Sequence, residues 1–268
     1  MNFTPPLRIF VGWDIREQAA FDVCCDSIFR HASVPVSVEA IGMGVEKFRG
    51  VYWRPTEMRR GPAGREQLWD VISNAPMSTG FSFARFLVPH LAGFHGWAVF
   101  CDCDFMFRAD VAKLFALADP KYAVQVVKHD YVTGLDVVKM DGQVNPSYPR
   151  KNWSSLVLWN CQHPSNAVVT PELVNAQTGR DLHGFSWLPD HLIGGLPFEW
   201  NWLELEPLAV HFTRGTPDMP GHDGAAYADE YRRYLKGDDH AVEPEGRAAP
   251  HQESDVGQGK GSVVQGRE

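Results

Sequence analysis

Three consecutive segments near the N-terminus constrain the fold more than any other feature of the sequence. Residues 7–14, LRIFVGWD, form a short apolar run that ends at Gly and Asp, as a first buried strand does. Residues 15–32 carry apolar side chains at helical spacing, and residues 34–43 alternate as a second strand does. Strand, helix and strand at this pitch indicate a βαβ unit. The sequence therefore predicts an α/β fold with a Rossmann-like, mainly parallel central sheet flanked by helices.

The rest of the chain continues this alternation as far as residue 236. Further strands are expected at 96–104, 122–127, 154–160 and 208–213, and further helices at 78–94, 110–117, 170–177 and 224–235. Residues 44–78 are rich in Gly, Arg and Pro and resist assignment. After Lys236 bulky apolar residues almost disappear, so we expect one domain over 1–236 and a disordered C-terminal tail over 237–268.

Charge and cysteine usage narrow the class of protein. A net charge of −8 argues against nucleic acid as a partner, because phosphate binding needs clustered Lys and Arg. The five cysteines are odd in number, include the adjacent pair Cys24 and Cys25 and form no CxxC pair, which favours reduced thiols and a cytoplasmic protein. No signal peptide is evident, and no stretch approaches the roughly 20 apolar residues of a membrane span. We expect a soluble protein without a transmembrane segment, for which peripheral membrane contact remains open.

Two carboxylates stand where a buried strand meets solvent, in VFCDCDFMF at residues 99–107. In extended geometry residues i and i+2 point the same way, so Asp102 and Asp104 can converge on one cation. Ligands of an open parallel sheet bind outside the carboxyl ends of its strands. Mg²⁺ or Mn²⁺ takes oxygen ligands and often bridges protein carboxylates to substrate phosphates. The competing interpretation is a solvated acidic turn.

The residues around this acid pair resemble glycosyltransferases of the GT-A fold. The pattern h-h-D-x-D-h-h-h-x-x-D-h-x-x-L-F is similar to that of family 8, which includes bacterial galactosyl- and glucosyltransferases and glycogenin. Five other blocks follow the family's order and together span residues 7 to about 220: RIFVGWDIREQAAFDVCCDSI, STGFSFARFLVPHL, SSLVLWN, LPDHLIG and AVHFTRGTP. The resemblance implies a GT-A fold with a nucleotide-sugar donor.

The same resemblance assigns roles to five residues. Asp102, Asp104 and His211 would bind Mn²⁺ or Mg²⁺, and Asp102 would also face the donor. Gly12 and Asp14 would lie against the base and ribose of a nucleotide, most often uridine. The structural alternatives are an ordinary core or surface histidine for His211, and a strand-end turn with a helix cap for Gly12 and Asp14.

Three further positions complete the implied site. Arg85 would contact the donor near the acid pair, or form a structural salt bridge with one of the acids because an unpaired buried charge is costly. Asp190 would lie near the sugar and the acceptor, or act as a helix cap. The lysine that the family supplies to the diphosphate is missing, with Pro217 or Asp218 near that place; Arg214, or a Lys or Arg from residues 47–65, would substitute.

The resemblance implies metal-dependent transfer of a hexose from a nucleoside-diphosphate sugar, with UDP favoured, to a saccharide or other hydroxyl acceptor, with retention of configuration. Two alternatives of other classes stay open. One is a nucleotide-sugar-binding protein without transfer activity. The other is a phosphatase of the haloacid dehalogenase type, although the DxDxT pattern of that class is not matched here.

Overall fold

The computed structural model describes residues 5–61, 64, 66–129, 137–138, 144–145, 150, 152–201 and 207–237. The predicted tail lies outside the described residues from position 238 onward. The last described helix, α7, covers Ala228–Leu235, so the domain boundary at 236 stays a prediction.

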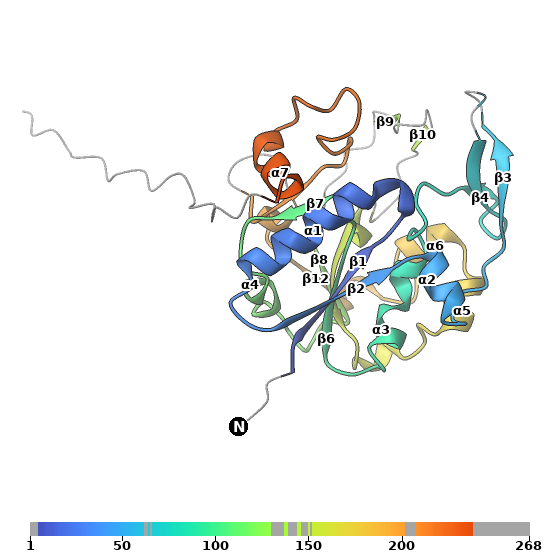
Figure 1. Ribbon diagram of the computed structural model, residues 1–268. Helices are drawn as coiled ribbons and strands as arrows, with labels where there is room; N and C mark the ends of the chain where they lie inside the picture. Colours follow the sequence, from blue (N-terminus) through green and yellow to red (C-terminus); the bar gives the residue numbers. More distant parts are fainter. Residues whose placement is uncertain are drawn as a thin grey trace, which may run out of the picture. The chain divides into compact units, whose positions relative to one another are not determined.

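A six-stranded sheet in the order β12-β8-β11-β6-β1-β2 forms the centre of the fold (Figure 1). Its strands are β1 (Leu7–Gly12), β2 (Val36–Ile41), β6 (Trp97–Cys101), β8 (Val124–Val126), β11 (Leu156–Asn160) and β12 (Ile193–Gly195). Only β11 pairs antiparallel with its neighbours β6 and β8, whereas the other pairs are parallel. The prediction of a mainly parallel sheet is therefore confirmed.

Helices pack against this sheet as the βαβ pattern requires. α1 (Gln18–His31) buries Ala20, Val23, Cys24 and Ile28, the apolar positions that recur at helical spacing. It contacts α7 and β7 (Phe105–Phe107), while α3 (Val88–Leu91) contacts β6 and β11. Figure 1 shows α1 and α3 on opposite sides of the central strands. The remaining helices are short: α2 (Met43–Phe48), α4 (Ala112–Phe115), α5 (Pro171–Ala176) and α6 (Gly179–His183).

Smaller β elements stand beside the central sheet. β7 pairs antiparallel with β13 (Ala209–His211), so the predicted strand at 208–213 exists but joins a two-stranded ribbon. The segment that resisted assignment contains β3 (Thr56–Arg60), β4 (Glu66–Asp70) and β5 (Ala75–Pro76), which form an antiparallel sheet. β9 (Val137–Val138) and β10 (Val144–Asn145) form another antiparallel pair.

Several predicted elements are shorter than expected, among them the helix at 78–94 and the strand at 96–104. The helix expected at 78–94 begins only at Ala84, as a 3-10 turn over Ala84–Leu87 that leads into α3. The backbone of Gly80 is instead held by its neighbours: its N–H donates to Asp14 at 2.7 Å, and its carbonyl accepts from Met43 at 2.8 Å. The strand expected at 96–104 ends at Cys101, because the chain turns before it enters β7.

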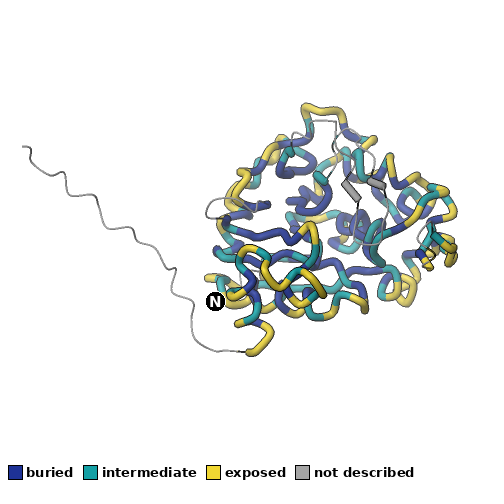
Figure 2. The backbone as a smooth tube through the Cα atoms, turned by 90° about the horizontal axis from the view of Figure 1, so that it is seen from above, coloured by how far each residue is buried: buried dark blue, intermediate teal, exposed yellow. Residues whose placement is uncertain are grey.

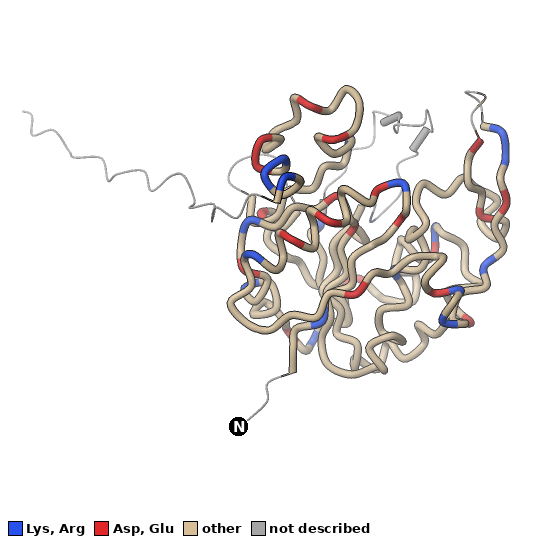
Figure 3. The backbone as a smooth tube through the Cα atoms, viewed as in Figure 1, with Lys and Arg blue, Asp and Glu red and all other residues tan. Residues whose placement is uncertain are grey.

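The main core cluster extends across the sheet and is rich in aromatic side chains, and a smaller cluster forms around Met106, Val210 and Tyr231. Every residue of β11 is buried, and Figure 2 shows the central strands as buried between exposed loops. β6, β8 and β11 carry no charged residue, and charges lie mainly on the surrounding segments in Figure 3. Trp159, Phe185 and Trp200 are buried in the main cluster.

All five cysteines are free thiols, and four of them are buried. The Sγ atoms of Cys24 and Cys101 lie 3.9 Å apart between α1 and β6. Cys103 is also buried and directs its Sγ toward Glu17 at 3.5 Å. Cys101 and Cys103, which alternate with the two aspartates in the sequence, therefore both pack in the interior. None of the described helices is long and apolar enough to cross a lipid bilayer.

Candidate metal centre and donor site

The topology of the sheet places two acids at one edge. β1 lies between β2 and β6 and pairs in parallel with both, so the chain order reverses at β1. Asp14 follows the carboxyl end of β1, and Asp102 follows the carboxyl end of β6. Open α/β sheets bind ligands outside such a reversal point. The edge that carries Asp14 and Asp102 is therefore the expected place for a site.

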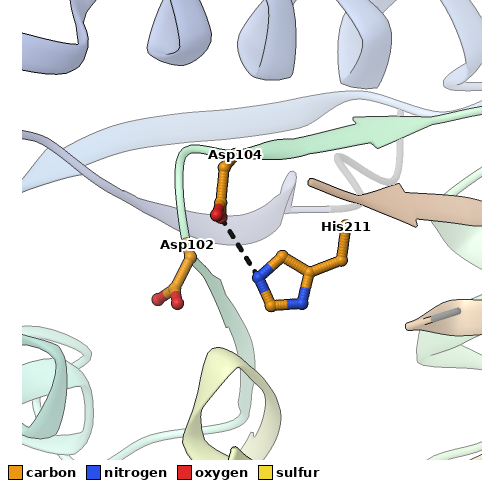
Figure 4. A group of neighbouring side chains, drawn as sticks. All are labelled: Asp102, Asp104 and His211. Atoms are coloured by element: carbon orange, nitrogen blue, oxygen red, sulfur yellow. Dashed lines mark ion pairs between the residues drawn. The ribbon is translucent and has the colours of Figure 1, made fainter. Parts of the chain in front are cut away.

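Asp102, Asp104 and His211 converge at this edge, and one ligand atom from each lies within 4.8 Å of the others (Figure 4). Asp104 stands in the turn between β6 and β7. The pairing of β7 with β13 sets His211 opposite Phe105, and the N–H of Phe212 donates to the Asp104 carbonyl at 2.9 Å. The structure thus brings together the three residues predicted as metal ligands.

The donor atoms of this cluster suit a hard divalent cation. Two oxygens bound to one Mg²⁺ lie at most about 4.2 Å apart, so a small side-chain movement would bring the cluster to that spacing. The two carboxylates are the ligand type that Mn²⁺ and Mg²⁺ prefer, and the imidazole nitrogen suits a transition metal such as Mn²⁺ better than it suits Mg²⁺. The residues present therefore fit the predicted ion, whereas their service as ligands stays a prediction.

Within the cluster, His211 and Asp104 form an ion pair. Nε2 of His211 lies 3.3 Å from Oδ1 of Asp104. Burial alone would lower the pKa of His211, but the charge of Asp104 outweighs it and raises that pKa. Burial likewise opposes ionisation of Asp104, yet the neighbouring His211 lowers the pKa of the carboxyl. A divalent cation that displaces the proton on Nε2 of His211 would neutralise the negative charge of Asp102 and Asp104 in its place.

Arg85 forms an ion pair with Asp102, which is the structural salt bridge that the sequence analysis gave as an alternative. Its Nη1 lies 2.7 Å from Oδ1 of Asp102 and donates to the carbonyl of Ser154 at 2.9 Å. The guanidinium also packs over the rings of Phe81 and Phe100. These contacts fix Asp102 beside Asp104, and a direct contact of Arg85 with a donor stays a prediction.

Gly12 and Asp14 both have internal roles at the end of β1. A Cβ on Gly12 would lie 2.6 Å from the ring of Phe81, which explains a glycine at this position. Asp14 is buried, and its two oxygens accept four hydrogen bonds, three from Arg16 and one from Gly80. A carboxylate has about four acceptor sites, so this one is fully used. The predicted strand-end cap exists, and nucleotide contacts of both residues stay predictions.

Two residues at this edge escaped the sequence reasoning. Arg16 donates to the carbonyl of Ser78 at 2.8 Å besides holding Asp14, and its side chain is 59% exposed. Glu17 lies beside the acid pair, where burial, followed by the charges of Asp104 and Asp14, raises its pKa to about 7. Both follow the first strand directly, so the only available signal was their place next to Asp14.

Asp190 lies apart from the metal cluster, in a second hollow of the surface. A cavity of about 600 Å³ is lined by Arg150, Trp153, Arg180, Asp181, Gly184, Ser186, Leu188 and Asp190. The Asp190 side chain is 87% exposed and pairs with Nη2 of Arg150 at 2.5 Å. Trp153, which lines this cavity, directly precedes the Ser154 that Arg85 contacts. Asp190 begins a 3-10 turn, but its side chain does not cap it.

The residues considered as replacements for the diphosphate-binding lysine lie in different surroundings. Arg214 is exposed in the turn after β13, and Asp218 accepts a hydrogen bond from Tyr231 at 2.7 Å. From the 47–65 segment, Arg54 is fully buried and bonded to Asp70. Of the cations with described contacts, Arg16 and Arg85 are the ones that touch acids at the carboxyl edge.

Comparison with known proteins finds a relative of high sequence identity and several solved structures of similar fold but low sequence identity. The chain is 46% identical over 235 residues to Protein CDI of Arabidopsis thaliana, and the alignment covers 84% of each protein. No family profile matches the chain.

Among solved structures, the glycosyltransferase GlyE of Streptococcus pneumoniae TIGR4 aligns with a TM-score of 0.54 at 12% identity over 86% of this chain. The galactosyltransferase LgtC, in a complex with donor and acceptor sugar analogues, aligns with a TM-score of 0.53 at 11% identity, covering 86% of this chain and 96% of LgtC. The bifunctional glycosyltransferase WbbM gives a TM-score of 0.53 at 15% identity, covering 87% of this chain.

The chain spans 60% of the GlyE chain and 52% of the WbbM chain. At these identities the likeness concerns the fold, which is the GT-A fold that the sequence predicts.

Proposed function

We infer that this chain, which belongs to the same protein family as Protein CDI of Arabidopsis thaliana, is a metal-dependent glycosyltransferase that uses a nucleotide sugar. One observation carries the proposal. In a GT-A fold, Asp102, Asp104 and His211 converge on one point at the carboxyl edge of the sheet, beside the strand order reversal. Such a cluster is what a cation that bridges protein and diphosphate requires.

The reaction would transfer a hexose from a UDP-linked donor to a saccharide or another hydroxyl acceptor. Departure of the diphosphate puts negative charge on its β-phosphate. A bound Mn²⁺ or Mg²⁺ would neutralise that charge. Arg85 holds Asp102 in place and would add positive potential close to the phosphate. Gly12 and Asp14 would face the base and ribose, which requires Arg16 to release Asp14.

The cavity around Asp190 is the candidate place for sugar and acceptor. Its lining combines the indole of Trp153 with the charged groups of Arg150, Arg180 and Asp181, and indole faces with polar side chains are suited to sugars. Arg214, exposed after β13, would approach the diphosphate when it binds. Retention of configuration, the likeness to family 8 and a cytoplasmic setting, which the five free thiols favour, belong to this proposal as well.

A donor-hydrolysis assay tests the proposal. The protein is incubated with Mn²⁺ and, in turn, with each common nucleotide sugar, and release of nucleoside diphosphate is measured. We expect release from one donor, its loss in EDTA, and at least an approximately 100-fold decrease in Asp102→Asn and Asp104→Asn.

The matched control for these two variants is Asp229→Asn, since Asp229 is 92% exposed on α7 and pairs with Arg232 of the same helix. This variant should retain full release. Donor binding without turnover would support a binding protein instead. Phosphate release from p-nitrophenyl phosphate, without any nucleoside diphosphate release, would support the phosphatase alternative.

A further inference from the structure

A chain of buried hydrogen bonds reaches His211 from the side opposite Asp104. The Oγ of Ser155 donates to the carbonyl of Asn152 at 2.9 Å, and Nδ2 of Asn201 donates to that Oγ at 3.0 Å. Oδ1 of Asn201 then lies 2.8 Å from Nδ1 of His211. Ser155, Asn201 and His211 are 5%, 3% and 7% exposed, so water does not replace these contacts.

The direction of this chain follows from its first member. A backbone carbonyl can only accept, so the Asn152 carbonyl uses the single proton of the Ser155 hydroxyl. The hydroxyl oxygen must then accept from Asn201, which turns the amide nitrogen toward Ser155 and the amide oxygen toward His211. An amide oxygen cannot donate, so Nδ1 of His211 must carry a proton. In a neutral imidazole the lone pair therefore resides on Nε2.

The backbone and one ring stack hold the imidazole in the same orientation. The ring lies on that of Phe105, with centroids 4.2 Å apart and planes inclined by 16°. Figure 4 shows one nitrogen of the ring directed at Asp104 and the other turned away from it. Asn201 ends the 3-10 turn Phe198–Trp200, and its backbone N–H donates to the carbonyl of Phe198 at 2.9 Å. The lone pair of Nε2 thus faces the ligand atoms of Asp102 and Asp104.

We propose that Asn201 and Ser155 are positioning residues that hold His211 in its Nδ1-protonated form and thereby set the cation affinity of the Asp102–Asp104–His211 cluster. This inference rests on the proposed function only in that the cluster binds a divalent ion. Partners of this kind fix the tautomer and orientation of a metal-binding histidine, and their loss typically weakens metal binding about 10- to 100-fold.

The first test reads the tautomer directly, in the full chain with wild-type sequence. The protein is labelled with ¹⁵N and freed of metal with EDTA, and the two ring nitrogens of His211 are assigned by NMR at a pH that leaves the imidazole neutral. We expect a proton on Nδ1 and none on Nε2. A proton on Nε2 would overturn the inference, and this measurement needs no variant that has to fold.

The second test measures Mn²⁺ affinity by the electron paramagnetic resonance signal of free Mn²⁺. Asn201→Leu removes the acceptor, keeps the branching of the side chain and should weaken binding about 10- to 100-fold. Asn201→Asp keeps an oxygen acceptor opposite Nδ1 and should restore most of the affinity. Ser155→Ala, which affects His211 only through Asn201, should weaken binding less than Asn201→Leu.

A buried asparagine elsewhere in the chain provides the matched control. Asn175 is 4% exposed and bonded to backbone groups at positions 51, 53 and 171. Asn175→Leu should lower stability and leave Mn²⁺ affinity unchanged. Equal affinity in Asn201→Leu and the wild type, or absence of Mn²⁺ binding by the wild type, would overturn the inference. The expected tautomer and affinities without nucleoside diphosphate release would contradict glycosyl transfer alone.

Discussion

Two buried arginine–aspartate pairs, one in the scaffold and one at the candidate site, differ in how many of their polar groups are used internally. Arg54 and Asp70 are fully buried, and the guanidinium bonds both carboxylate oxygens, the carbonyls of Val174 and Gln177, and the hydroxyl of Ser73. All five N–H groups of this arginine thus have acceptors.

At the carboxyl edge, the Arg85 and Asp102 side chains are 7% and 17% exposed, and their ion pair borders the converging ligand atoms. The two pairs carry the same charges, but the site pair is slightly more exposed than the scaffold pair. The scaffold pair joins β4 to the segment around α5, whereas the site pair holds a carboxylate next to two other ligand atoms. All five N–H groups of Arg54 have acceptors, whereas Nε of Arg85 has none among the described residues.

Removal of each arginine tests this contrast and should give the largest effects on stability. Arg54→Met leaves Asp70 as an uncompensated buried charge, and we expect a loss of about 3–5 kcal/mol in the free energy of unfolding. Arg85→Met should cost less, about 1–3 kcal/mol, because Asp102 reaches water. Urea unfolding in EDTA measures both. Equal losses in the two variants, or a larger loss in Arg85→Met, would contradict the comparison.

The acid-rich edge should also make stability depend on pH through Glu17. Burial and the neighbouring acids raise the pKa of Glu17 from 4.5 to about 7. Between these pH values the folded state binds more protons at Glu17 than the unfolded state does, so its contribution to stability falls as pH rises. Glu17→Gln should therefore gain stability relative to the wild type by up to about 3 kcal/mol from pH 4.5 to pH 7 and above.

Urea unfolding in EDTA across this pH range measures the difference. Glu57→Gln is the control, because the Glu57 side chain is 46% exposed on β3. A difference between Glu17→Gln and the wild type that does not change with pH would show that Glu17 does not make stability depend on pH.

A substitution of Gly12 can distinguish a steric role of this residue from a role in ligand binding. A methyl group at this position would overlap the buried ring of Phe81, so Gly12→Ala should destabilise the protein by about 1–3 kcal/mol without any nucleotide present. Thermal and urea unfolding check this expectation. Gly44→Ala, on α2 with open space around it, should be neutral or slightly stabilising. A stable Gly12→Ala variant would remove the steric explanation for this glycine.

The exposed pair of Asp190 and Arg150 should give the smallest effect. The guanidinium of Arg150 also donates to the carbonyls of Gly184, Phe185 and Leu188, so it keeps acceptors when the carboxylate is removed. Asp190→Asn should change the free energy of unfolding by less than about 1 kcal/mol. A larger loss in urea unfolding would place this pair with the scaffold rather than at the surface.

The parts of the fold that sequence could predict are those encoded by local pattern. Apolar runs at residues 7–14 and 122–127 and helical spacing over residues 15–32 specify β1, β8 and α1, since each element buries its own regular set of positions. The segment at 44–78 has no such period, because β3, β4 and β5 form a small antiparallel sheet with mixed polar faces. The Arg54–Asp70 pair inside it therefore could not be foreseen.

The residues of the candidate site also differ in whether the sequence could indicate them. Asp102 and Asp104 are marked by their place after an apolar strand, and resemblance supplied His211 and the candidate roles of Arg85 and Asp190. No pattern in the sequence indicates a role for Asn201. Its contact with His211 depends on the register of β13 on β7 and on the 3-10 turn at Phe198–Trp200. Contacts that depend on register between distant segments become visible only in three dimensions.

The buried thiols give this chain an internal reporter of its own motions. Burial raises the pKa of Cys161 to about 12 and that of Cys103 well above its usual value, so both sulfurs are protonated and poorly nucleophilic at neutral pH. An alkylating reagent can modify them only while the surrounding segment is transiently open. The labelling rate at Cys103 would then follow opening beside the acid pair, and that at Cys161 would follow opening at the end of β11.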